Sequence, residues 1–166
     1  MVEVTPHTVL GIGKSEWCIV LFKEADGPRL LPIWMRAYRA QPIVLWMKSI
    51  RLGRPQTHDL FIEVVEKLGA ELIRIAVYGV EQGALLSRLI LHKSDEQIAL
   101  ECRSSDGIAV ALKKGIPITV ADEIMEVAGF RPQQSRTEGA AAQSDGEEEE
   151  LTAFKDFVEG LDLNGL

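Results

Sequence analysis

Three apolar stretches in the middle of the chain decide its fold: LIRIAVYGV at residues 72–80, ALLSRLILH at residues 84–92 and QIALEC at residues 97–102. They are rich in β-branched and other apolar residues and are bounded by polar turn residues, a pattern typical of strands. Only a few residues, 81–83 and 93–96, connect them. Because connections this short join neighbouring antiparallel strands, this stretch predicts a three-stranded antiparallel sheet.

Further strands are expected on both sides of this sheet. Short apolar or alternating runs occupy residues 8–12, 17–23 and 29–34, with a hairpin turn at residues 25–28, and residues 117–120 form a short extended segment.

Four helices are expected between and after these strands, at residues 43–52, 57–68, about 104–114 and about 122–129. Pro42 fits the first turn of the first helix and would kink a helix that began as early as residue 36. Thr57 can cap the second helix, Leu60, Val64 and Leu68 share one of its faces, and Gly69 ends it. The combined pattern predicts an α+β domain, a mainly antiparallel sheet with helices packed on it, over residues 1–130.

The last part of the chain has a different composition. Residues 131–150 are rich in Gln, Ser, Gly, Ala and Glu without apolar periodicity, which predicts a disordered acidic linker. Residues 151–166 carry an apolar stripe with helical spacing, which predicts a C-terminal amphipathic helix. Residues 138–166 contain nine acidic residues and one lysine, so the net charge of −7 comes from this tail, and the body is nearly neutral.

Composition excludes several classes of protein. With 46% apolar and 26% charged residues the chain is not wholly disordered, and no apolar run approaches the ~20 residues of a membrane span. The N-terminus does not resemble a secretory signal. Cys18 and Cys102 form no disulfide framework, and the spacing of cysteines and histidines predicts no structural zinc site. We expect a reduced cytoplasmic protein that does not associate with membranes.

Two predicted helix starts carry the polar groups of phosphoryl chemistry. RPQTHDL at residues 54–60 brings an arginine, a histidine and a carboxylate together, and RSSDGIA at residues 103–109 brings an arginine, two hydroxyls and a carboxylate together. Arginine binds phosphate through its fork of donors, carboxylates can hold Mg²⁺ or Mn²⁺, and histidine can transfer protons near neutral pH. The structural interpretation of both starts is strong, because Thr57, Asp59, Ser104, Ser105 and Asp106 are ordinary helix-capping residue types, and either aspartate alone is more often a capping residue than a ligand.

Three separated motifs resemble the bifunctional nuclease domain family over about residues 1–130. They are LPIW at residues 31–34, RPQTHDL at residues 54–60, and residues 103–118, which contain the short motifs Ser-Asp, Ile-Ala and Ile-Pro-Ile. The resemblance implies a compact α+β domain, usually dimeric, in a family associated with DNase and RNase activity. It carries over to these positions: Arg54, Thr57, His58, Asp59, Arg103, Ser105 and Asp106.

The chain also departs from the family pattern. Arg36 and Arg39 stand where the family has glycine and glutamate, so a metal ligand is lost if that glutamate supplies one, although Arg39 can add affinity for phosphate. Gly107 replaces an alanine, which costs about 0.5–1 kcal/mol of helix stability.

The resemblance favours a nuclease with little sequence preference that hydrolyses DNA, RNA or both. In this hypothesis His58, Asp59 and Asp106 are catalytic, and the two aspartates hold Mg²⁺ or Mn²⁺, without an organic cofactor. Phosphate would be bound by Arg54, Thr57, Arg103, Ser105, Arg36 and Arg39. The alternative is a non-catalytic regulatory module that binds nucleic acid or protein, which the two arginine replacements favour.

Three further expectations concern assembly. Arg54, His58, Asp59, Arg103 and Asp106 should line a single cleft. The apolar surplus around Trp17, Trp34 and Trp46 predicts a homodimer. The C-terminal helix should dock on its own subunit or on a protein partner and hold residues 147–150 near the basic surface, which would weaken nucleic-acid binding.

Overall fold

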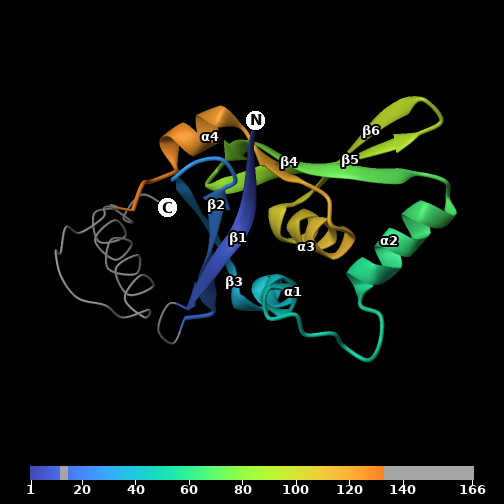
Figure 1. The fold of residues 1–166 in the computed structure, drawn as a ribbon, viewed down its shortest axis with the longest axis horizontal. Helices are drawn as coiled ribbons and strands as arrows, with labels where there is room; N and C mark the ends of the chain where they lie inside the picture. The colour runs from blue at the N-terminus through green and yellow to red at the C-terminus, as the bar shows by residue number, and fades with distance from the viewer. Residues whose placement is uncertain (12–14, 133–166) are drawn as a thin grey trace.

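The structure, a computed structural model, describes residues 1–11 and 15–132 (Figure 1). The strands are β1 (Val2–Gly11), β2 (Trp17–Glu24), β3 (Leu30–Arg36), β4 (Glu71–Glu81), β5 (Ala84–Lys93), β6 (Glu96–Arg103) and β7 (Ile118–Val120). The helices are α1 (Ala37–Met47), α2 (Thr57–Lys67), α3 (Ser104–Lys114) and α4 (Asp122–Val127). The expected linker and C-terminal helix lie outside the described residues.

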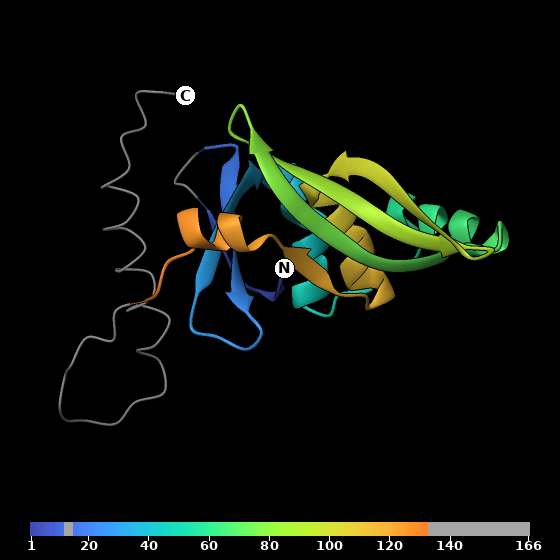
Figure 2. The same cartoon turned by 90° about the horizontal axis from the view of Figure 1, so that it is seen from above.

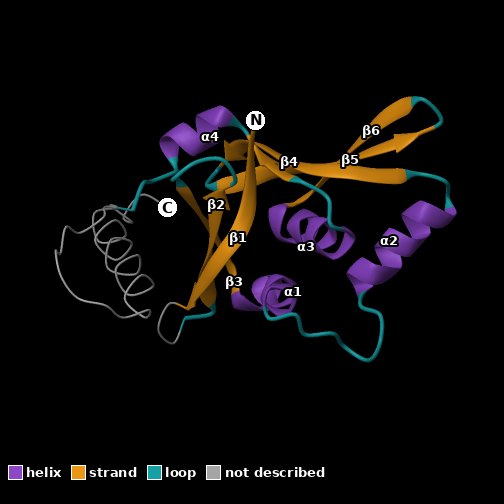
Figure 3. Cartoon of the chain, viewed as in Figure 1, coloured by secondary structure: helices purple, strands orange, loops and turns teal. Residues whose placement is uncertain are grey.

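The seven strands form one mixed sheet in the order β3-β2-β1-β7-β4-β5-β6 (Figure 3). The predicted antiparallel pairing of β4 with β5 and of β5 with β6 is confirmed, as is the hairpin of β2 and β3. The short strand β7 runs antiparallel to β1 and parallel to β4, so it joins two antiparallel halves into one sheet. The α+β class and the mainly antiparallel sheet are therefore confirmed.

The sheet is strongly bent, and α1, α2 and α3 lie on its inner side (Figures 1 and 2). Helix α3 is the central one of the three. Eight of its residues, including Ile108 and Ala111, are buried, and it contacts α1, α2, β4 and β5. Both ends of α3 can therefore present side chains to neighbouring elements.

Gly107 has a packing role that helix propensity does not reveal. A Cβ atom at this position would lie 1.9 Å from Cδ1 of Ile75 and 2.9 Å from Sγ of Cys102. These distances are far below van der Waals contact, so a side chain at residue 107 would force Ile75, Cys102 or α3 itself to shift. The expected loss of helix propensity is the cost of close packing between helix and sheet.

The first helix begins earlier than predicted, since α1 starts at Ala37 and Pro42 lies inside it. Proline has no N–H to donate to the carbonyl of Tyr38, so one helical hydrogen bond is lost. Burial of Ala40 and Ile43, which are at most 2% exposed, fixes the helix against the sheet on both sides of this position. Tertiary packing thus overrides a local signal that sequence reasoning treated as a boundary.

Helix α2 is attached at the surface. Of its residues only Val65 is buried, and the face formed by Leu60, Val64 and Leu68 is exposed to solvent. Trp17, Trp34 and Trp46 are also about 40% exposed, which is the surplus apolar surface behind the homodimer prediction. Within residues 1–11 and 15–132, no helix is both long and apolar enough to cross a membrane.

Candidate functional site

The start of α2 is held by a capping box. The backbone N–H of Gln56 donates to Oδ2 of Asp59 over 2.7 Å, and the Gln56 side chain accepts a hydrogen bond from the backbone N–H of Asp59. The expectation that Thr57 caps this helix is wrong, because Thr57 is already the first helical residue and the cap lies one residue earlier. Gln56 and Asp59 reciprocally satisfy backbone donors that a helix start leaves open.

Asp59 also binds the end of α3. Nζ of Lys113 donates to Oδ1 of Asp59 over 2.8 Å, a contact between residues that are far apart in the sequence. The ammonium group of Lys113, followed by the hydrogen bond from the Gln56 N–H, holds the pKa of the Asp59 carboxyl below its usual value. Asp59 is therefore ionised at neutral pH, with each of its oxygens engaged by the fold.

The start of α3 is anchored to the sheet through Ser104. Its hydroxyl lies 2.7 Å from the hydroxyl of Ser87 on β5 and donates to the carbonyl of Leu85 over 3.2 Å. Ser104 and Ser105 are both at most 9% exposed, and the structure gives α3 no side-chain cap. The expected capping role of these serines is wrong, because Arg103 precedes the helix and Ser104 is directed to β5 instead.

Arg103 and Asp106 form an ion pair at this helix start. Nε of Arg103 donates to Oδ2 of Asp106 over 2.6 Å, and the Arg103 side chain is 62% exposed. The terminal nitrogens of Arg103 make no hydrogen bond with the described residues. They remain available to an anionic group that approaches from solvent.

The two helix starts meet at His58. Nε2 of His58 lies 3.8 Å from Oδ1 of Asp106, and the two side chains are 21% and 36% exposed. The separation is too long for a hydrogen bond, so the contact is electrostatic and becomes attractive when the imidazole is protonated. Sequence reasoning placed these residues together, and the structure confirms that they do lie together.

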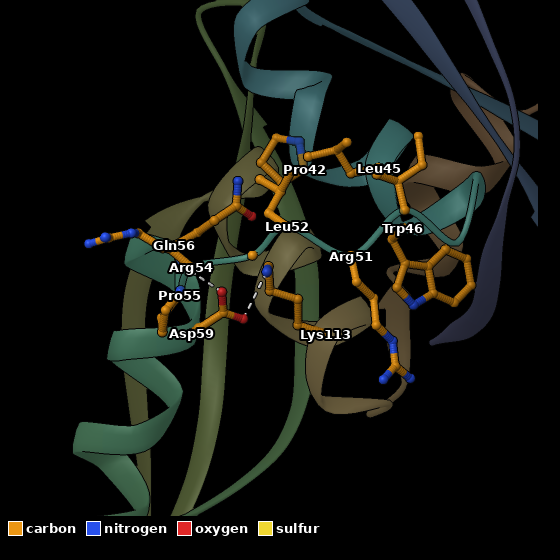
Figure 4. Close-up of a pocket in the computed structure, with 12 residues that line it drawn as sticks. Pro42, Leu45, Trp46, Arg51, Leu52, Arg54, Pro55, Gln56, Asp59 and Lys113 are labelled. Carbon is orange, nitrogen blue, oxygen red and sulfur yellow. Dashed lines mark hydrogen bonds and ion pairs between the residues drawn. The ribbon is translucent and has the colours of Figure 1, made fainter.

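The other candidate residues divide between two cavities, except Thr57, which is exposed and lines neither. Arg54 and Asp59 line a cavity of about 580 Å³, together with Lys113 (Figure 4). A second cavity of about 400 Å³ is lined by Arg36, Arg39, Arg103 and Ser105. Of the five residues expected in one cleft, Arg54 and Asp59 thus line the first cavity and Arg103 the second, whereas His58 and Asp106 contact each other and line neither. Helix α3 reaches the second cavity with its first turn and the first cavity with its last turn, roughly 13 Å further along the helix.

The arginines that depart from the family pattern are already engaged. NH1 of Arg36 donates to Glu16 over 2.7 Å, and its guanidinium lies 4.6 Å from the ring centroid of Trp17. Nε of Arg39 donates to the hydroxyl of Tyr38 over 3.1 Å. Both side chains line the second cavity, but each can bind phosphate only alongside, or in exchange for, its present contact.

The carboxylates do not fit a divalent cation in this arrangement. Both oxygens of Asp59 are engaged by Gln56 and Lys113, and Asp106 is paired with Arg103. Among the residues that the structure describes, no group of three or more His, Cys, Asp or Glu side chains could hold a metal ion.

Sequence reasoning missed three residues of the first cavity: Trp46, Arg51 and Lys113. Arg51 belongs to an acid-free stretch between Asp26 and Asp59, which was a usable signal. Lys113 carried no signal, because a lysine in the last turn of a helix is common and its pairing with Asp59 depends on tertiary structure.

Comparison with known proteins supports the resemblance seen in the motifs. The family model "Bifunctional nuclease domain" matches residues 20–133. An uncharacterized protein of Mycobacterium tuberculosis, Rv1829, is 33% identical over 144 residues, which cover 86% of this chain and 84% of that protein.

Plant relatives are more distant and longer. Bifunctional nuclease 1 of Oryza sativa subsp. japonica is 28% identical over 76% of this chain, and Bifunctional nuclease 1 of Arabidopsis thaliana is 29% identical over 77%. The matched parts cover only 39% and 41% of those proteins. The family match nevertheless covers both helix starts, the His58–Asp106 contact and the whole sheet except β1 and the first three residues of β2, and the chain belongs to the bifunctional nuclease domain family.

Proposed function

We propose that this protein hydrolyses phosphodiester bonds in DNA, RNA or both, with His58 as the proton-transferring group. The observation that carries the proposal is the position of His58, 3.8 Å from Asp106, which pairs with an arginine whose terminal nitrogens make no hydrogen bond with the described residues. A histidine beside a carboxylate is a common acid–base arrangement, because the carboxylate stabilises the imidazolium formed by proton transfer.

In the proposed reaction, water or a ribose hydroxyl attacks phosphorus. Its proton passes to His58, the bond between phosphorus and the departing sugar oxygen breaks, and that oxygen takes a proton from solvent. The guanidinium of Arg103 stabilises the charge that develops on the phosphate oxygens. Asp106 touches no substrate atom in this scheme and acts as a positioning residue for His58.

The test is cleavage of a fluorescent single-stranded RNA or DNA oligonucleotide by the full-length protein. His58→Ala should lower the rate about 10²- to 10⁴-fold, the usual contribution of a general acid–base group. The matched control is His92→Ala, which replaces an exposed histidine on β5. Cleavage that survives His58→Ala would contradict the proposal.

The same cleavage assay in EDTA, in Mg²⁺ and in Mn²⁺ tests whether Asp59 and Asp106 hold a divalent cation. Cleavage that continues in EDTA would agree with the structure, in which both Asp59 oxygens already accept hydrogen bonds from Gln56 and Lys113. An absolute requirement for either cation would contradict the conclusion that these carboxylates do not form a metal site, because they would then have to rearrange.

A second candidate function is a non-catalytic module that binds nucleic acid. It is favoured by the capping box and the Lys113 pair, which give Asp59 a complete structural role. The same oligonucleotide distinguishes the two candidate functions. A non-catalytic binding module would raise the fluorescence anisotropy of the oligonucleotide and leave it uncut.

A further inference from the structure

The loop between α1 and α2 forms a cavity that the proposed chemistry does not use. Residues 50–56 line it from one side, Trp46 at the end of α1 from another, and Lys113 at the end of α3 from a third (Figure 4). Its volume of about 580 Å³ lies within the range of small-ligand pockets. Asp59, the neighbour of His58 in the chain, belongs to its lining.

The arginines of this cavity differ from most arginines of the fold. Arg51 and Arg54 make no ion pair or hydrogen bond with the described residues, although Arg29, Arg88 and Arg103 each pair with a carboxylate. Asp59 is the sole carboxylate among the residues that line the cavity, and its charge is already balanced by Lys113. The cavity therefore has an excess of positive charge that an anionic ligand would neutralise.

Trp46 gives this cavity an aromatic wall. Its side chain is 46% exposed, although α1 buries Ala40 and Ile43 against the sheet. Figure 4 shows the guanidinium of Arg51 on the same side of the cavity as the exposed indole, and the side chain of Arg54 extending from the opposite side. An exposed indole with an unpaired arginine beside it is a combination suited to nucleic acid, since bases stack on aromatic rings and arginines bind the phosphates. In a duplex both faces of each base are covered by its neighbours, so an indole can stack only on an unpaired base.

We propose that this cavity binds an unpaired nucleotide of single-stranded nucleic acid. The indole of Trp46 stacks on the base, Arg51 binds the phosphate beside that base, and Arg54, on the opposite side of the cavity, binds a phosphate further along the strand. The site holds the strand beside the start of α2, where His58 lies. This inference rests on the proposed function, because it names the substrate class, but its test requires no cleavage.

The test measures binding to fluorescent oligothymidylate of about 12 nucleotides, and to the same strand paired with its complement, by the full-length protein in the His58→Ala background, in which the strand should stay intact. Trp46→Ala should weaken binding of the single strand about 5- to 100-fold, the usual effect of removing one stacking residue. Trp46→Phe retains a ring and should keep most of the affinity. Leu100→Ala, which replaces an apolar side chain of β6 that is 40% exposed and lines neither cavity, is the control and should leave binding unchanged.

The two arginines are tested by salt dependence. Each contact with a single-strand phosphate contributes about 0.7 to the slope of log affinity against log salt concentration. Arg51→Ala and Arg54→Ala should each reduce that slope by about this amount. Thermal unfolding of each variant confirms that it folds.

Two results would overturn this inference: equal affinity for single strand and duplex, or unchanged single-strand affinity in folded Trp46→Ala. Neither result concerns cleavage, so failure of this inference is distinguishable from failure of the proposed function. Conversely, Trp46-dependent binding without any cleavage by the wild-type protein would support the site and reject the nuclease.

Discussion

Helices α2 and α3 start with the same pattern, and the structure uses it in two different ways. Each helix has 11 residues and an aspartate at its third position, Asp59 in α2 and Asp106 in α3. Asp59 completes a capping box and binds Lys113, so its oxygens serve the fold. Asp106 accepts no backbone hydrogen bond from the described residues; it pairs with the exposed Arg103 and lies 3.8 Å from His58. The position of a carboxylate in a helix thus does not decide its role.

The fourth position shows a second contrast. In α2 it is Leu60, which is 58% exposed, and in α3 it is Gly107, where even a methyl group would collide with Ile75. Helix α3 is a core helix, and α2 is a surface helix attached to it. The candidate site therefore lies where a buried helix meets a more exposed one.

The largest expected effect is a loss of cleavage rate when Asp106, the aspartate of α3, is replaced. Asp106→Asn preserves the shape of the side chain but removes the charge that stabilises protonated His58, so the cleavage rate should fall about 100-fold, equivalent to about 2.7 kcal/mol. Because Asp106 acts through His58, the pH–rate profile should shift as well. Wild-type activity in Asp106→Asn would make the two aspartates equivalent and would remove the contrast.

The next effect is on stability. Gly107→Ala should lower the free energy of unfolding by about 2 kcal/mol, since overpacking of a tight core outweighs the gain in helix propensity. Chemical denaturation measures this change. Ile75→Val removes the closest atom, so the double variant should recover part of the loss. A Gly107→Ala protein that is more stable than wild type would show that α3 can move away from β4.

A smaller effect is expected for the aspartate of α2. Asp59→Asn keeps an oxygen that can accept from the Gln56 N–H but loses the charge paired with Lys113. Because the Asp59 side chain is 37% exposed, the loss of stability should be about 1 kcal/mol. The cleavage rate of the folded protein should not change. A rate loss as large as that of Asp106→Asn would assign Asp59 a catalytic role.

The smallest expected effect is the pH dependence of the contribution that Asp59 makes to the free energy of unfolding. The pKa of Asp59 is lower in the folded protein than in the unfolded chain. Its stabilising contribution is therefore complete above the unfolded value of about 3.9 and is lost as the pH falls through the folded value. The difference in unfolding free energy between wild type and Asp59→Asn should narrow below about pH 4. A difference that stayed constant there would mean that the Lys113 pair does not stabilise the fold.

The sequence predicted those features that depend on local patterns. Alternation and short turns were sufficient for β4, β5 and β6, and the paired helix starts correctly brought His58 and Asp106 together. The start of α1 was missed because burial of Ala40 and Ile43 overrides Pro42 locally. The role of Gly107 and the pairing of Asp59 with Lys113 depend on contacts between distant segments, which no local pattern reveals.

The most direct test of the account is a double-mutant cycle between His58→Ala and Asp106→Asn, measured as the single-turnover cleavage rate of a single-stranded oligonucleotide. If Asp106 acts only through His58, the double variant should lose about as much rate as His58→Ala alone, because the second change removes nothing that remains. If the two losses multiply instead, the residues act independently, and the contact between the two helix starts is not the catalytic unit.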